Sequence, residues 1–76
     1  MSKKITIEKL QLKSSKVLSE IAERRQELGI SQADLAYQLN MTPSGYFKIE
    51  KGESKLDLIR LFEIAHYLNI DAKKLF

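Results

Sequence analysis

Two short predicted helices and the tight turn between them decide the fold of this chain, and they occupy residues 31–52, SQADLAYQLNMTPSGYFKIEKG. Ser31 is suited to cap the first of these helices, because its side chain can accept a hydrogen bond from a backbone N–H in the first turn. Leu35, Ala36 and Leu39 recur at helical spacing and form one apolar stripe. The stripe predicts a short helix that is buried along one side.

The turn and the second short helix follow directly. Asn40 tolerates the left-handed backbone conformation that a tight turn requires. Thr42 and Pro43 then fit the N-cap and the first helical position, where proline is well accommodated. Tyr46 and Ile49 lie three residues apart and are expected to face the core, and the helix is expected to end before Gly52.

The sequence on either side of this pair predicts further helices. Apolar residues from 17 to 28 recur at helical spacing and stop at Gly29. Asp57 is placed to cap a helix over residues 58–68, and a last short turn opens at Asp71. The chain is therefore predicted to be all-α, a compact bundle of about five helices.

Composition excludes several classes of function. The 76 residues carry a formal charge of +3, contain no cysteine and include a single histidine, His66. Disulfide frameworks and metal sites built from cysteine or histidine clusters are therefore excluded. No nucleophile–base pair and no glycine-rich phosphate loop is recognisable, so we expect no enzyme, catalytic residue, cofactor or metal. No apolar run is long enough to span a membrane and the start does not resemble a secretory signal, so a cytoplasmic protein is expected.

The excess positive charge lies at the start of the chain. We expect a basic, amphipathic N-terminal arm over residues 1–15, followed by one domain over residues 16–76. Three interpretations of the arm remain open: a solvated, partly disordered tail, a short strand, or a helix capped by Thr6 that continues into the first helix. If the arm is separate, Ser14 or Ser15 would cap the first helix instead. The strand interpretation rests on the alternation of Ile5, Ile7, Leu10 and Leu12; the helical one rests on the spacing of Ile7, Leu10, Ser14, Val17 and Ile21.

Taken together, these motifs make the chain resemble the Cro/phage-repressor-type (XRE-like) helix-turn-helix family. The resemblance covers roughly residues 17–76. It rests on Ser31-Gln32 at the start of a helix, the Leu35-Ala36 pair, and Ile49-Glu50-Lys51-Gly52 at the end of the next helix. It implies a lambda-repressor-like DNA-binding domain whose segment 43–51 lies in the DNA major groove.

The resemblance also implies roles for individual residues. Gln32 matches a glutamine that contacts a DNA phosphate and braces the recognition helix, and Thr42 matches the cap of that helix, which faces a phosphate. Arg25 and Glu50 match a structural salt bridge. The full set of DNA-binding residues expected on this basis is Gln32, Thr42, Pro43, Ser44, Phe47, Lys48, Lys51 and Lys55.

Physical chemistry independently supports part of this set. Lys48 is long and cationic and can donate to guanine O6 and N7, whereas Ser44 discriminates weakly between bases. Phe47 can pack on a thymine methyl group. Four residues depart from the family pattern: Asn40 replaces a turn glycine, Leu56 stands where a proline often precedes the next helix, and Pro43 and Gly45 are unusual in a recognition helix.

We therefore expect a small dimeric transcriptional regulator, a repressor that binds a roughly palindromic double-stranded DNA operator. The homodimer surface is expected at the C-terminal end, using parts of the helix over 58–68 and of the last short turn with Leu75 and Phe76, and the arm can add to it. The alternative is an antitoxin or protein-interaction module that has the same fold and binds a protein partner through residues 1–15.

Overall fold

The computed structural model describes residues 6–75, and all regular structure in this range is helical. Four α-helices are followed by one turn of 3-10 helix, so the predicted all-α class is confirmed and the fifth predicted helix is the 3-10 turn. The elements are α1 (Ile7–Glu27), α2 (Gln32–Gln38), α3 (Pro43–Glu50), α4 (Leu58–Leu68) and η1 (Ala72–Leu75).

The first helix settles the conformation of the arm from residue 6 onward. Thr6 is the N-cap of α1, and its hydroxyl accepts a hydrogen bond from the backbone N–H of Lys9 over 3.2 Å. Of the three interpretations the helical one is right from Ile7 onward, and the strand and the tail are wrong there; Ile5 lies outside the described residues. Neither Ser14 nor Ser15 caps a helix, because α1 passes through both without a break.

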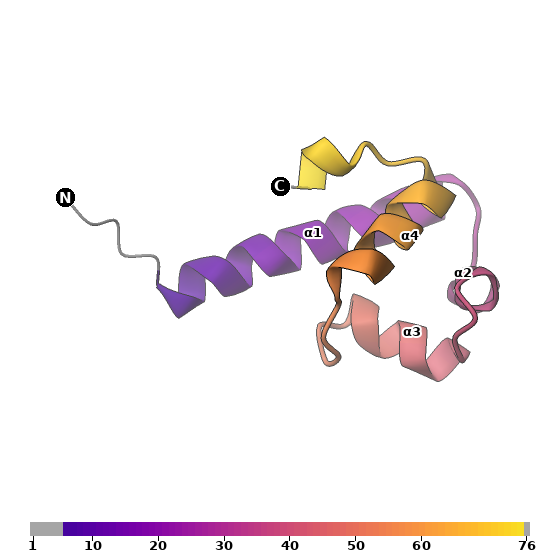
Figure 1. Ribbon diagram of the computed structural model, residues 1–76, viewed down its shortest axis with the longest axis horizontal. Helices are drawn as coiled ribbons and strands as arrows, with labels where there is room; N and C mark the ends of the chain where they lie inside the picture. The colour runs from indigo at the N-terminus through magenta and orange to yellow at the C-terminus, as the bar shows by residue number, and fades with distance from the viewer. Residues whose placement is uncertain (1–5, 76) are drawn as a thin grey trace.

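The two halves of α1 have different surroundings. Residues 6–16 are all exposed, and the half-buried part of the helix begins at Val17. Figure 1 shows the N-terminal half of α1 extending beyond the other helices, while its C-terminal half lies beside α4. Because of this extension, the molecule measures 46 Å along its longest principal axis and 23 and 20 Å along the other two.

The core forms where α2, α3 and α4 pack against the C-terminal half of α1 (Figure 1). Its fully buried side chains come from all four helices, and Leu75 of η1 closes one side at 6% exposure. The expectation that Leu75 belongs to a dimer surface is therefore wrong, because its side chain completes the core of its own chain. Phe76 lies outside the described residues. The largest fully buried side chains are Tyr46, Ile21, Leu35, Ile64 and Leu68.

Candidate nucleic-acid interface

A left-handed turn sets the crossing of α2 and α3. Asn40 has a φ of 57°, as expected for a residue that replaces a turn glycine. The N–H of Met41 donates to the carbonyl of Ala36 over 2.8 Å, which closes the end of α2. Ala36 is fully buried. Its methyl side chain lets α2 lie close behind α3, so that the opposite side of α3 faces outward.

The start of α3 is fixed by Thr42. Its hydroxyl oxygen accepts from the N–H of Gly45 over 3.0 Å, and Pro43 occupies the first helical turn. A β-carbon at residue 45 would lie 3.1 Å from Thr42 Oγ1 and 3.6 Å from Met41 Cε. The unusual glycine in this helix therefore leaves room for the cap. The Thr42 hydroxyl hydrogen remains available to an acceptor outside the protein.

The two sides of α3 differ in exposure. Tyr46 and Ile49 are buried, as expected for core residues. On the other side Pro43, Ser44, Phe47 and Lys48 are all exposed. The outward side of α3 is thus accessible to solvent, and it carries one cation, Lys48, and one aromatic ring, Phe47.

Two further lysines continue this surface. Lys51 Nζ lies 4.8 Å from the centre of the Phe47 ring and 3.2 Å from a carboxylate oxygen of Glu53. The cation–π contact restricts the Phe47 ring on the outer side of α3. Lys55 is exposed in the connection between α3 and α4, beside a hollow between that connection and α1. It is farther along the chain from α3 than Lys51 is.

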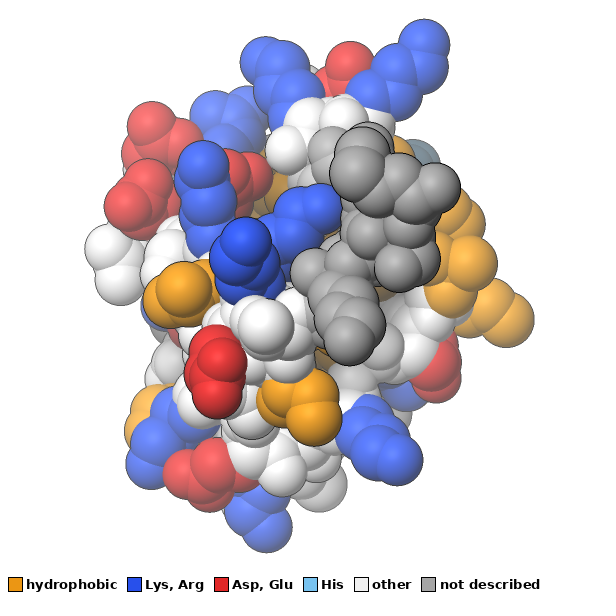
Figure 2. Space-filling view, turned by 90° about the vertical axis from the view of Figure 1, so that its left-hand side faces the viewer, with side chains coloured by type: hydrophobic (Ala, Val, Ile, Leu, Met, Phe, Trp, Pro, Cys, Tyr) orange, Lys and Arg blue, Asp and Glu red, His pale blue; other side chains and the backbone are white. Residues whose placement is uncertain are grey.

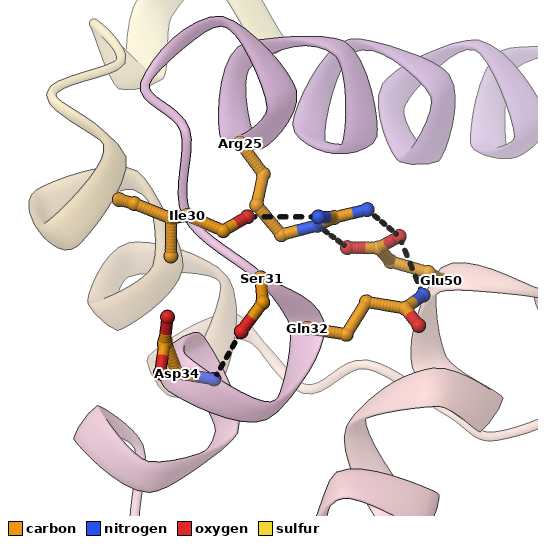
Figure 3. A network of polar contacts seen from close by, with 6 residues as sticks. All are labelled: Arg25, Ile30, Ser31, Gln32, Asp34 and Glu50. Atoms are coloured by element: carbon orange, nitrogen blue, oxygen red, sulfur yellow. Dashed lines mark hydrogen bonds and ion pairs between the residues drawn. The ribbon is translucent and has the colours of Figure 1, made fainter.

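Behind this surface, the Glu50 carboxylate of α3 accepts hydrogen bonds from side chains of α1 and α2 (Figure 3). Arg25 of α1 donates from Nε to Glu50 Oε2 over 2.7 Å and from Nη2 to Oε1 over 3.2 Å. Its Nη1 donates to the carbonyl of Ile30 over 2.9 Å, and Gln32 Nε2 donates to Glu50 Oε1 over 3.1 Å. The structure thus brings together Arg25 and Glu50, as the family pattern implies.

The resemblance implied that Gln32 braces α3, but it did not indicate Glu50 as the partner. Gln32 is half-buried and supports the end of α3 from behind. An amide group carries two donor hydrogens, and this bond uses one of them. Gln32 can therefore position α3 and still donate to a phosphate.

Burial and hydrogen bonding act in opposite directions on this network. Burial disfavours the charged form of Glu50, but the hydrogen bond from Arg25, with further ones including that from Gln32, outweighs it and lowers the pKa of Glu50. The hydrogen bond to Glu50 raises the pKa of Arg25 against the effect of burial. Burial, followed by the nearby Glu50 carboxylate, raises the pKa of Tyr46. Arg25 and Glu50 are therefore both ionised at neutral pH.

A second long-range contact fixes the other end of α2. Arg60 of α4 donates from Nη1 to the carbonyl of Leu39 over 2.8 Å. This bond satisfies a carbonyl at the C-terminus of α2 and places a cation near the negative end of the helix dipole. Sequence patterns did not single out Arg60, because a cation in the first turn of one helix gives no local sign that it serves another helix.

Neither a metal-binding cluster nor a membrane-spanning helix is found among the residues that the structure describes. Within residues 6–75 no group of histidine, aspartate or glutamate side chains is placed to hold a metal ion. No helix in the same range is long and apolar enough to cross a membrane. His66 is exposed on α4, where its ring packs edge-on against that of Tyr67.

This arrangement of a supporting helix, a tight turn and an outward helix defines a helix-turn-helix protein. The family profile described as helix-turn-helix matches residues 21–75. The chain therefore belongs to the Cro/repressor-type helix-turn-helix family, a family of DNA-binding regulators. No curated protein and no solved structure matched the chain.

Proposed function

We propose that this chain is a homodimeric, cytoplasmic transcriptional repressor that binds double-stranded DNA sequence-specifically and reads the major groove with α3. The observation that supports this most directly is the exposure of Ser44, Phe47 and Lys48 on a helix whose opposite side is fully buried. A recognition helix must stand clear of its own domain in this way to enter a groove.

The exposed side chains divide by chemistry into two groups. Lys48 has the reach and the donors for guanine, Phe47 can contact a thymine methyl group, and Ser44 and Pro43 lie close to the base edges. Around them, Thr42, Gln32, Lys51 and Lys55 offer hydroxyl, amide and ammonium donors suited to phosphates. We propose that the first group selects the sequence and that the second sets the position of the domain on the duplex.

A second copy extends the reading surface. A short helix contacts few bases, so two copies related by a two-fold axis would read a palindromic operator. Their half-sites would be one helical turn apart, about 34 Å. Because Leu75 belongs to the core, it contributes nothing to the surface that joins the two copies.

A protein partner is the second candidate function, and the exposed first half of α1 favours it. Ile7, Leu10 and Leu12 are 72%, 49% and 71% exposed on a helix that extends beyond the bundle. Figure 2 looks onto this end of the molecule and shows hydrophobic side chains standing among lysine and arginine side chains. An antitoxin or interaction module would use this surface and would not require α3 to read bases.

Fluorescence anisotropy with labelled duplexes over a series of salt concentrations tests the proposed function. A regulator of this kind shows an affinity that falls steeply with salt and a sequence preference that persists when unlabelled random duplex is added. Binding that is weak and indifferent to sequence at every salt concentration would contradict base reading by α3 and would favour the protein-partner candidate.

A further inference from the structure

One face of α1 carries a regular stripe of charge. Six charged residues follow each other at alternating intervals of four and three positions, which places them on a single side of an α-helix. All of them are exposed except the half-buried Glu20. The first three are basic and the last three are acidic. We call this set the α1 stripe: Lys9, Lys13, Lys16, Glu20, Glu23 and Glu27.

The α1 stripe is symmetric about Leu18 with its charges inverted. Lys16 and Glu20 are each two positions from Leu18, and Lys13 and Glu23 are each five positions from it. Lys9 and Glu27 are each nine positions away. A second α1 laid antiparallel, with the two Leu18 residues level, therefore sets each lysine opposite a glutamate. A parallel copy would set like charges against each other.

Within one chain, the same order of charges is unfavourable. Neighbours on the stripe mostly have the same sign, and like charges three or four residues apart destabilise a helix. Lys9 lies in the first turn and Glu27 is the last residue of α1, so each has the sign that its end of the helix dipole disfavours. Among the ion pairs within residues 6–75, only Arg24 with Glu27, at 3.7 Å, includes a member of the stripe.

The surface at each end of the stripe matches the other end in charge. At its acidic end lies a hollow of about 430 Å³, whose lining holds four carboxylates, from Glu20, Glu23, Glu27 and Asp71, against the cations of Arg24 and Lys74. At its basic end, a hollow of about 440 Å³ lies between Leu12 and the stems of Lys9, Lys13 and Lys16. In the antiparallel arrangement, the ammonium groups of one copy would meet the net negative hollow of the other, and the lysine stems would cover Leu12.

We propose that a second copy of this chain binds along the α1 stripe, with the two α1 helices antiparallel. Exposed ion pairs are individually weak, so this contact is sensitive to salt and acts through the number and order of its pairs. The proposal gives the homodimer of the proposed function an interface. It is tested without DNA, so that its failure leaves DNA binding by α3 unaffected.

Sedimentation equilibrium of the full chain at low and high salt is the experiment, with charge reversals as the probe. One variant carries Lys9→Glu, Lys13→Glu and Lys16→Glu; the other carries Glu20→Lys, Glu23→Lys and Glu27→Lys. We expect the unmodified chain to be a dimer at low salt and to dissociate at high salt. Each variant alone should be monomeric, because its whole stripe has one sign, and an equimolar mixture of the two should dimerise again.

Two controls make the result specific to the stripe. A chain with Glu8→Lys, Glu53→Lys and Glu63→Lys has the same net charge as the second variant, yet its changes lie off the stripe, and it should still dimerise. Circular dichroism verifies that each variant is helical. A monomeric unmodified chain, reversed variants that dimerise alone, or a mixture that stays monomeric would overturn the proposal. Ile59 is 75% exposed on α4. A dimer that persists in both reversed variants but is lost on Ile59→Asp would also overturn the proposal, because it would place the interface on α4.

Discussion

Arg25 Nε and Glu50 Oε2 are 2.7 Å apart, and this pair joins the last third of α1 to the final residue of α3. The side chains are only 10% and 7% exposed. The ion pair therefore lies directly behind the helix that we propose reads DNA, and it holds that helix from the side that faces the core.

Removing the carboxylate should destabilise the fold substantially. Glu50→Gln leaves the Arg25 charge buried without a counter-ion, and losing one partner of a buried pair typically costs about 3 kcal/mol or more. Urea unfolding followed by circular dichroism measures the change. Lys51→Gln, which removes an exposed charge one residue away, is the matched control and should have little effect on the free energy of unfolding.

The ion pair of Arg25 and Glu50 also predicts how the stability of the fold depends on pH. The pKa of Glu50 in the fold lies below its ordinary value of 4.5, so the ionised carboxylate stabilises the fold at higher pH. This stabilisation is complete above about pH 4.5 and is lost as the pH falls through the folded pKa. The difference in unfolding free energy between the unmodified chain and Glu50→Gln should therefore be largest near neutral pH and shrink below pH 4.5. A difference that stays constant down to strongly acidic pH would contradict the assignment.

The N-cap of α3 should stabilise the fold about as much as a typical N-cap does. Thr42→Ala removes the hydroxyl that accepts from the Gly45 N–H, and we expect a loss of about 1 kcal/mol of stability. Thr42→Ser keeps the hydroxyl and should retain most of the stability. Thermal unfolding of the three chains compares them directly, and equal stabilities for Thr42→Ala and Thr42→Ser would show that the cap contributes nothing.

Leu75 should behave as a core residue. Its side chain is 6% exposed against the helical bundle, so Leu75→Ala should cost about 2–5 kcal/mol. Leu12→Ala, which truncates a leucine that is 71% exposed, is the comparison and should leave the unfolding free energy nearly unchanged. A Leu75→Ala chain as stable as the unmodified one would contradict the position of η1 against the core.

Local signals in the sequence predicted much of the fold. Ser31, Thr42 and Asp57 all cap helices as expected, because a cap depends only on the next three residues. The start of α1 was ambiguous for the same reason: Thr6 and the two serines at 14 and 15 all have the chemistry of a cap. Only the continuity of the helix through both serines distinguishes them.

Contacts between distant parts of the chain could not be predicted in this way. The bond from Gln32 to Glu50 and the bond from Arg60 to the Leu39 carbonyl depend on how the helices cross, which no local pattern specifies. The prediction that Leu75 lies on a dimer surface was wrong, because the sequence around a leucine does not show whether its side chain packs on its own core or on a partner. The roles of Ser44, Phe47 and Lys48 toward bases remain predictions.

Base selection should depend on Lys48. Lys48→Ala should stay folded, because the side chain is exposed, but should lose discrimination between preferred and altered duplexes by about 1–3 kcal/mol, roughly 5-fold to 150-fold. Lys55→Ala removes a cation placed for phosphates and should weaken all duplexes alike. Competition binding with paired duplexes measures both effects, and equal loss of discrimination in the two variants would contradict the division of roles.

The most direct test of the account is selection of bound duplexes from a random DNA pool by the unmodified chain and by Lys48→Ala in parallel. The account predicts that the unmodified chain enriches a palindromic sequence with half-sites one helical turn apart, and that Lys48→Ala relaxes the choice of base at a fixed position in each half-site. Enrichment of no sequence, or the same sequence enriched with equal stringency by both chains, would contradict the proposal that the outer side of α3 reads the major groove.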